Sequence, residues 1–236
     1  MLTQRQNEIL KVLIGEYIKT AEPISSDFLA KKYDFGLCSS AIRIEMQNLI
    51  KAGFLEQPHT SAGRIPTDQA YRFFVDSIIR SYEAGRKKKI ENELEDLLSQ
   101  KSKNQFELAS HLAKFLADTS NNLTVVHFID DNISWKEGWD EISKEPEFSD
   151  QGFIFDFFNF LNDFEQKIKK LEIQEINIYI GHEIPISRAE NLSLICSACP
   201  ISKNQTAFIS IIGPRRMDYD KNINLLYSLN KALRGL

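Results

Sequence analysis

Residues 57–67, QPHTSAGRIPT, bring together several side chains that can do chemistry. His59 and Ser61 are of the types that serve as general base and nucleophile. They stand two residues apart, however, without an evident acidic residue to orient the imidazole and without a recognisable oxyanion device. Pairs of this kind arise often by chance, so we predict that the stretch is not catalytic and that the chain is not an enzyme.

The same stretch has the composition of a loop that grips nucleic acid. The hydroxyl groups of Thr60 and Ser61, together with main-chain N–H groups, can approach phosphates, and Arg64 can enter a narrow minor groove. Gly63 permits close approach of the backbone, and prolines near both ends restrict the loop before it docks. We therefore expect this loop to contact DNA.

A polar helix face precedes this loop. The segment SSAIRIEMQNLIKAG, residues 39–53, places four polar side chains away from its apolar side: Ser40, Arg43, Gln47 and Lys51. Arg43 has the fork geometry that reads guanine, Gln47 can pair with adenine, and Lys51 suits a phosphate. Any solvent-exposed helix carries the same residue types, so these residues alone leave both interpretations open.

Other chemical patterns are weaker. Cys196 and Cys199 have the spacing of a redox motif but fall inside an expected strand, where residues three apart point to opposite faces, so buried structural thiols are expected. A zinc ion would need two more ligands, and His182 with Cys38 is not a persuasive supplement. We predict no metal and no cofactor.

Six phenylalanines lie between Phe153 and Phe164, on one expected helix. A helix this aromatic usually forms part of a hydrophobic core, but it can also line a pocket for a small molecule. A ligand-sensing regulator is therefore the alternative function.

Composition bounds the class of protein. The 236 residues are 42% hydrophobic, enough for real cores, and the net charge of −4 argues against a protein that coats nucleic acid everywhere. Three cysteines suggest reduced thiols, and neither a secretory signal nor a run of about 20 apolar residues is present. A cytoplasmic protein without a membrane partner is expected.

The elements that must hold the candidate residues begin with three helices. Apolar spacing predicts the first after Thr3, the second after Ser25 or Ser26, and the third after Ser39, each residue serving as an N-cap. A short strand at FLEQ, the 57–67 loop and a long helix capped by Thr67 follow. This order is typical of a winged helix-turn-helix DNA-binding domain.

Three regions are expected in an α+β protein: the winged helix at residues 1–83, a charged linker helix at 84–104, and a second domain at 105–236. In the last region, strands at LTVVHFI, INIYIG, LSLICSA and TAFISIIG interleave with a helix from Phe106 to Thr119, the phenylalanine-rich helix and a closing helix after Pro214.

Several blocks resemble the heat-inducible transcription repressor HrcA family. They are LTQRQNEILKVLIGEYIKTAEPISS, SSAIRIEMQNLIKAGFLEQPHTSAGRIPTDQAYRFFVD, EGWDEISKEPEFSD, IYIGHE and GPRRMDY, in the family's order. The resemblance implies a winged helix joined to a GAF-like domain, a homodimer, and binding to an inverted-repeat double-stranded DNA operator called CIRCE upstream of chaperone operons. It also implies that the chaperonin helps to keep the repressor active.

Two departures from the family pattern matter. Where the family's recognition helix usually reads alanine-threonine-isoleucine-arginine-asparagine, this chain has Ser40, Ala41, Ile42, Arg43 and Ile44, so operator preference is expected to change at one or two base pairs. The chain also has only a handful of residues between LTVVHFI and WKEGWDEI, where the family carries GAF strands and an inserted dimerisation domain. The second domain is therefore predicted to be a truncated GAF-like domain.

Dimerisation is expected through an apolar seam from Ile78 to Leu98, with the phenylalanine-rich helix or the sheet as alternatives. The expected DNA-binding residues are Ser39, Ser40, Arg43, Ile44, Gln47, Lys51, His59, Thr60, Ser61, Gly63 and Arg64.

Overall fold

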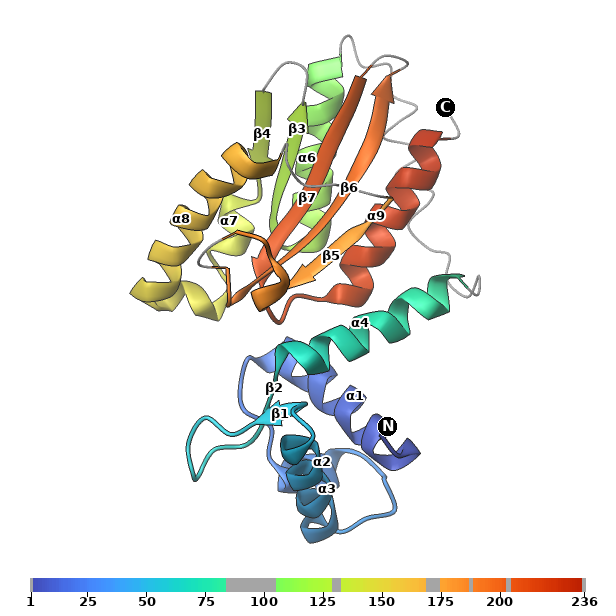
Figure 1. Cartoon of the computed structure of the whole chain (residues 1–236), viewed down its shortest axis with the longest axis vertical. Coiled ribbons are helices and arrows are strands. Elements are labelled where there is room, and N and C mark those ends of the chain that lie inside the picture. Colours follow the sequence, from blue (N-terminus) through green and yellow to red (C-terminus); the bar gives the residue numbers. More distant parts are fainter. Residues whose placement is uncertain are drawn as a thin grey trace. The chain divides into compact units, whose positions relative to one another are not determined.

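The structure is a computed structural model that describes residues 2–83, 105–128, 133–168, 175–186, 189–202 and 205–234. Its contacts divide the chain into two compact units, Met1–Ala84 and Gly85–Leu236 (Figure 1). The expected linker helix at 84–104, and with it most of the seam that ends at Leu98, lies outside the described residues.

Three helices open the first unit: α1 (Gln4–Thr20), α2 (Ser26–Lys32) and α3 (Ser39–Lys51). Thr3 caps α1 in the expected capping box, and Ser25 caps α2 by accepting from the Phe28 N–H. The expected cap of α3 was wrong. Cys38 is its N-cap, without a side-chain cap bond, and Ser39 is the first helical residue, because its hydroxyl donates to Asp27 instead.

The chain then forms a small antiparallel hairpin. Strand β1 (Leu55–Glu56) pairs with β2 (Ile65–Pro66), and the return of the loop between them adds a bridge between Arg64 and Ile24. Thr67 precedes α4 (Asp68–Glu83), and its hydroxyl accepts from the Ala70 N–H. Figure 1 shows the hairpin loop extending away from the helices of its unit.

Apolar side chains from all four helices form the core of the first unit. Fully buried members are Ile9, Leu10, Leu13 and Ile14 of α1, Leu29 of α2, Ile42 and Leu49 of α3, and Tyr71 and Val75 of α4. The apolar periodicity of the sequence thus corresponds to the inward faces, as expected for amphipathic helices around one core.

An ion pair between a buried carboxylate and a half-exposed lysine joins α1 to the end of α2. Glu16 is 1% exposed and accepts from Lys32 Nζ at 2.5 Å and from the Tyr33 hydroxyl at 2.6 Å. The hydrogen bonds from Lys32 and Tyr33 lower the pKa of Glu16, and the bond to Glu16 raises the pKa of Tyr33 to about 12.

The second unit is built on a five-stranded antiparallel sheet in the order β4-β3-β7-β6-β5. Its strands are β3 (Leu123–Phe128), β4 (Ile133–Glu137), β5 (Asn177–Ile180), β6 (Leu192–Ser202) and β7 (Gln205–Pro214). All six residues of β3 are buried, as expected for a central strand covered on both faces.

Helices cover both faces of this sheet (Figure 1). α6 (Gln105–Ser120) and α9 (Tyr219–Arg234) contact one face through β3 and β6. On the other face, α8 (Gln151–Lys167) buries Phe153, Phe157, Phe160 and Phe164 against a cluster that includes Leu123 and Leu194. The mixed helix and sheet composition confirms the expected α+β class at this coarse level.

Between β4 and α8 lie α7 (Trp139–Ile142) and the 3-10 helix η1 (Pro146–Ser149), and another 3-10 turn, η3 (Gly181–Glu183), follows β5. Arg216 connects this region to the end of β7: it is 8% exposed and donates to Glu147 and Glu145. None of the described helices is long and apolar enough to cross a membrane.

Candidate nucleic-acid interface

The outward face of α3 is polar with one apolar exception. Ile42, Met46 and Leu49 are buried in the unit, whereas the expected contact residues Ser40, Arg43, Ile44, Gln47 and Lys51 are exposed. Ile44 is 62% exposed. The helix therefore presents the predicted set of side chains on its solvent side, where a major groove can receive them.

Arg43 is held by residues of α2. Its Nε donates to the Ser26 hydroxyl at 3.4 Å, and its Nη2 lies 3.9 Å from the Asp27 carboxylate. Ser39 also donates to Asp27 and contacts the Ser26 hydroxyl at 3.2 Å. Because both partners of the Arg43 ion pair are more than half exposed, the pair is weak and the guanidinium stays accessible to solvent.

The loop between β1 and β2 is braced from within by Gln57. Its Nε2 donates to the carbonyl of Thr60 at 2.8 Å and to that of Ala62 at 3.1 Å. The Ala62 N–H donates to the His59 carbonyl at 2.9 Å, which closes a turn. His59, Thr60 and Ser61 are exposed at the tip, so their side chains and the tip backbone are accessible to a large ligand.

Gly63 and Arg64 have a different role from the tip. A Cβ on Gly63 would lie 2.5 Å from the backbone of Pro23 and Ile24, so the close approach that this glycine permits is to the connection between α1 and α2. Arg64 exchanges backbone hydrogen bonds with Ile24 at 2.9 and 2.7 Å, and its Nη1 donates to the Ala62 carbonyl at 3.1 Å. Both residues anchor the base of the loop.

α3 and the loop are joined through a short connection. The Phe54 N–H donates to the Leu49 carbonyl at 2.9 Å, and Thr67 donates its hydroxyl to the Gly53 carbonyl at 2.6 Å, so both ends of the hairpin are fixed to the end of α3. Gly53 has a φ of 81°, which the left-handed turn after the helix requires. The exposed helix face and the exposed loop thus belong to one compact unit.

Cys38 lies at the start of this helix face. Its thiol contacts the Ser40 hydroxyl at 3.1 Å, and this hydrogen bond, with a further one from the Ala41 backbone, lowers the pKa of Cys38. The thiol is exposed.

The other two cysteines, Cys196 and Cys199, are buried as expected and form no disulfide. Cys196 belongs to the core beneath α8, and burial raises its pKa to about 12. Cys199 donates to Asn230 of α9 at 3.1 Å, so the two thiols serve opposite faces of the sheet. Within the described part of the chain, no group of three His, Cys, Asp or Glu side chains is arranged to hold a metal ion.

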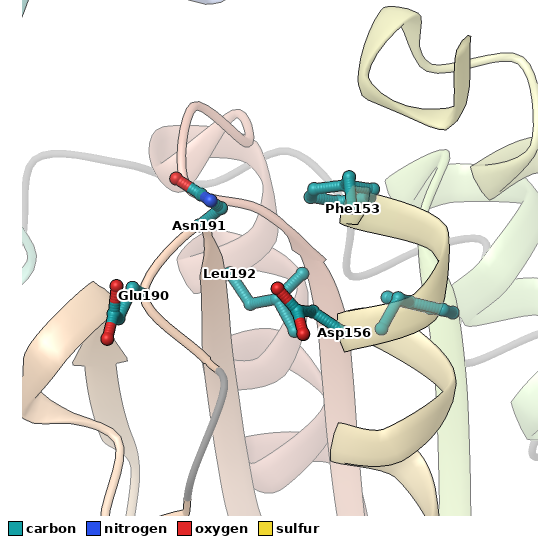
Figure 2. Close-up of a pocket in the computed structure, with 6 residues that line it drawn as sticks. Phe153, Asp156, Glu190, Asn191 and Leu192 are labelled. Atoms are coloured by element: carbon teal, nitrogen blue, oxygen red, sulfur yellow. The ribbon is translucent and has the colours of Figure 1, made fainter. Parts of the chain in front are cut away.

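The phenylalanines of α8 divide between a core and a surface. Four are buried, but Phe155 is 62% and Phe158 50% exposed, so the prediction of a core helix holds for one side only. Beside α8, a hollow of about 130 Å³ is lined by Phe153, Asp156, Phe157, Glu190, Asn191 and Leu192. Figure 2 shows Asp156 on α8 across from Glu190, which precedes β6. The hollow is smaller than the roughly 300–1,000 Å³ of typical ligand pockets.

Sequence reasoning missed two residues that shape this interface. Asp27 stands 16 positions before Arg43, and neither residue type nor spacing predicts their contact. Gln57 is the first residue of the 57–67 loop. The only sequence signal for its role is a long amide side chain at the start of a loop of mostly short side chains, where it can reach the loop's own carbonyl groups.

Comparisons with known proteins identify relatives along the whole chain. A family model described as the HrcA protein C terminal domain matches residues 72–223. The heat-inducible transcription repressor HrcA of Thermoanaerobacter pseudethanolicus is 29% identical over 332 aligned residues, covering 100% of this chain and 97% of that protein. Because the chain has 236 residues, that relative carries internal segments with no counterpart here.

Sequence identity to relatives is higher over shorter aligned stretches than over the whole chain. HrcA of Natranaerobius thermophilus is 58% identical over 78 residues, which cover 33% of this chain and 23% of that protein. A solved crystal structure of a hypothetical protein has a TM-score of 0.85 at 16% identity, covering 99% of this chain and 98% of that one, and supports the fold alone. The relatives' names, as transcription repressors, are consistent with the expected non-enzymatic role.

Proposed function

Since this chain belongs to the HrcA family of heat-inducible transcription repressors, we propose that it is a sequence-specific DNA-binding repressor of heat-shock operons. The observation that carries the proposal is the joint exposure of the α3 face and the β1–β2 loop on one compact unit. We infer that this unit is a winged helix-turn-helix, with α3 as the recognition helix and the loop as the wing.

Base reading is assigned to α3. Arg43 reads a guanine and Gln47 an adenine, while the exposed methyl groups of Ile44 meet a thymine methyl. The Arg43 guanidinium lies 3.9 Å from Asp27 and remains more than half exposed, so it is available to a base edge.

Phosphate contact is assigned to the loop tip and to the end of α3. His59, Thr60 and Ser61 are exposed where the wing would meet the DNA backbone, and Lys51 ends the helix. Gly63 and Arg64 act indirectly by fixing the base of the loop. Contacts of this kind release counterions, so affinity falls with rising salt.

The second unit is proposed to be a shortened GAF-like domain with a regulatory role in the cytoplasm. A homodimer bound to an inverted-repeat operator follows from symmetry, since a two-fold protein matches a two-fold DNA site. Chaperonin would maintain the active fraction of the repressor. When unfolded proteins occupy the chaperonin, the active fraction would fall and transcription of the operons would be derepressed.

A small-molecule sensor is the weaker alternative. The hollow beside α8 measures about 130 Å³, close to the ~150 Å³ of a cavity that accepts benzene. A metabolite of ordinary size needs more room, and a thermal-shift screen that raised the melting temperature would favour this alternative.

Fluorescence anisotropy tests the repressor function directly. The full chain is titrated onto a labelled CIRCE-type inverted-repeat duplex and onto a scrambled duplex of equal length, each at two salt concentrations. The proposal predicts a preference for the inverted repeat of about a thousandfold, the lower range for specific binders. Equal, salt-sensitive binding to both duplexes would refute the assigned operator.

Regulation is tested separately with the same assay. DNA affinity is measured after incubation at heat-shock temperature, with and without added chaperonin and ATP. The proposal predicts that heat lowers the active fraction and that chaperonin restores it. Full affinity after heating, together with no response to chaperonin, would refute this part.

A further inference from the structure

Asp27 places an exposed carboxylate beside the helix that is proposed to read DNA. It is the second residue of α2, and its side chain is 62% exposed. It lies next to the start of α3, because Ser39, the first residue of α3, donates its hydroxyl to Asp27. In a helix-turn-helix the first helix crosses the DNA backbone while the N-terminal residues of the second contact bases. A negative charge at this place repels phosphates and opposes binding to DNA in general.

The contact with Ser39 does not require that negative charge. A hydroxyl donates to a carboxylate oxygen or to the amide oxygen of an asparagine. Ser39 is also in contact with the Ser26 hydroxyl at 3.2 Å, so α2 and α3 are joined by more than one polar contact. The contact between the helices therefore accounts for an acceptor oxygen at position 27, and the charge calls for a separate explanation.

The charge of Asp27 faces Arg43. The Arg43 Nη2 lies 3.9 Å from the carboxylate, and its Nε donates to the Ser26 hydroxyl at 3.4 Å. These contacts leave both Nη1–H groups and the second Nη2–H of Arg43 available. Two parallel N–H groups at this end of a guanidinium can pair with O6 and N7 of guanine. Arg43 can thus keep Asp27 beside it while it presents donors to a base.

A guanine edge and a phosphate differ in what they require from an arginine. The O6 and N7 atoms of guanine are neutral acceptors, which bind through hydrogen bonds, whereas a phosphate is an anion that is also attracted by net charge. A carboxylate beside the guanidinium offsets the positive charge and leaves the donors in place. It therefore weakens the attraction to phosphate more than the attraction to guanine. Disfavouring the wrong partner in this way is a recognised route to specificity.

We propose that Asp27 is a specificity-determining residue, which disfavours contact of Arg43 with phosphates and so weakens binding to random DNA. The proposal rests on the proposed function and adds to it a residue outside α3 and the β1–β2 loop. On random DNA, Arg43 stays with Asp27. On the operator, the free end of the guanidinium binds guanine. The effect has the size of an exposed ion pair, because both side chains are more than half exposed.

Asp27→Asn tests this role, because asparagine keeps an acceptor for Ser39 and removes the charge. Fluorescence anisotropy of the full chain is recorded on a random-sequence duplex and on the inverted-repeat duplex over a salt series. Affinity for random DNA at low salt is expected to rise roughly two- to fivefold. Its salt slope should steepen by about 0.9, the value for one added phosphate contact. The gain on the inverted repeat should be smaller, because guanine already occupies Arg43 there.

Two further variants show whether the effect passes through Arg43. In an Arg43→Ala background, Asp27→Asn should raise the affinity for random DNA less than it does in the wild type, because no guanidinium is released. The matched control is Asp34→Asn in the turn between α2 and α3. Asp34 is exposed and accepts from the Gly36 N–H at 3.0 Å. Its loss of charge should shift both duplexes equally, with or without Arg43.

The outcomes separate this inference from the proposed function. Equal gains of Asp27→Asn on both duplexes, no gain, or the same gain with and without Arg43 would overturn the role of Asp27 alone. A wild-type chain that binds both duplexes equally would refute the operator, while the comparison on random DNA with and without Arg43 would still test Asp27. A wild-type chain that binds neither duplex would overturn both proposals.

Discussion

At the level of single residues, Ile44 sets this α3 face apart from an ordinary solvated helix. Single exposed apolar side chains are common on protein surfaces, but Ile44, which is 62% exposed, is available to a ligand that offers an apolar contact. A thymine methyl in the major groove is such a contact. We therefore propose that Ile44 contributes to the choice of operator sequence.

Replacing Ile44 by asparagine should change which base pair is preferred at one or two operator positions. An amide gains hydrogen bonds to adenine and loses the methyl contact, and each mismatched pair costs about 1–3 kcal/mol. The measurement is anisotropy across a set of single-base operator variants. An affinity profile identical to that of the wild type would contradict the assigned role.

The environments of the thiols predict how quickly each is alkylated. Hydrogen bonds lower the pKa of the exposed Cys38, so its thiolate fraction at a given pH is larger than that of an ordinary cysteine. Burial raises the pKa of Cys196 to about 12 and shields it from reagent. Iodoacetamide followed by mass spectrometry should label Cys38 first in the folded chain. Equal labelling of Cys38 and Cys196 would contradict these assignments.

Among the elements, the hairpin loop depends on one close backbone contact. Gly63→Ala would force a Cβ to within 2.5 Å of the Pro23 and Ile24 backbone, so it should destabilise the first unit by about 1–3 kcal/mol and weaken DNA binding. Gly15→Ala is the matched control, because its Cβ would meet nothing within 4 Å inside α1. That change should stabilise the protein by about 0.4–1 kcal/mol. Thermal unfolding compares the two, and equal melting temperatures would refute the prediction.

The contact of Glu16 with Lys32 and Tyr33 should make the free energy of unfolding depend on pH. The folded-state pKa of Glu16 is lowered by Lys32 and Tyr33, so its contribution is complete above the unfolded value of about 4.3 and is lost as pH falls through the folded value. Glu16→Gln should cost about 1.5–3 kcal/mol near neutral pH. Urea unfolding at several pH values measures the difference, which should shrink in acid; a constant difference would contradict this account.

Much of the element order could be predicted from the sequence, because apolar periodicity and caps are local signals. Thr3 and Gln6 form the expected capping box, and the strand predicted at LTVVHFI is β3. The expectation for Ser39 was wrong because its hydroxyl is used by Asp27, a partner that no local pattern reveals. β4 was missed because its five residues, ISWKE, include two charged ones and lie at the sheet edge.

At the scale of the whole molecule, the residue types of the candidate interface could be predicted from the sequence. The contacts that position these residues could not. The exposed positions of α3 follow from helical spacing alone. The contacts that hold Arg43 and the base of the loop join residues far apart in sequence, and these arise only when the unit folds. The division of α8 into a core side and an exposed side likewise depends on which side the sheet covers.

Base reading by α3 and phosphate contact by Lys51 are proposed to be separate functions, and two variants measured together test this division most directly. Anisotropy is recorded for Arg43→Ala and Lys51→Ala on the inverted-repeat duplex and on random DNA over a salt series. Arg43→Ala should cost about 1–3 kcal/mol on the operator alone, while Lys51→Ala should weaken both duplexes alike and reduce the salt slope by about one. If both variants lost affinity equally on operator and random DNA, α3 would not be reading sequence.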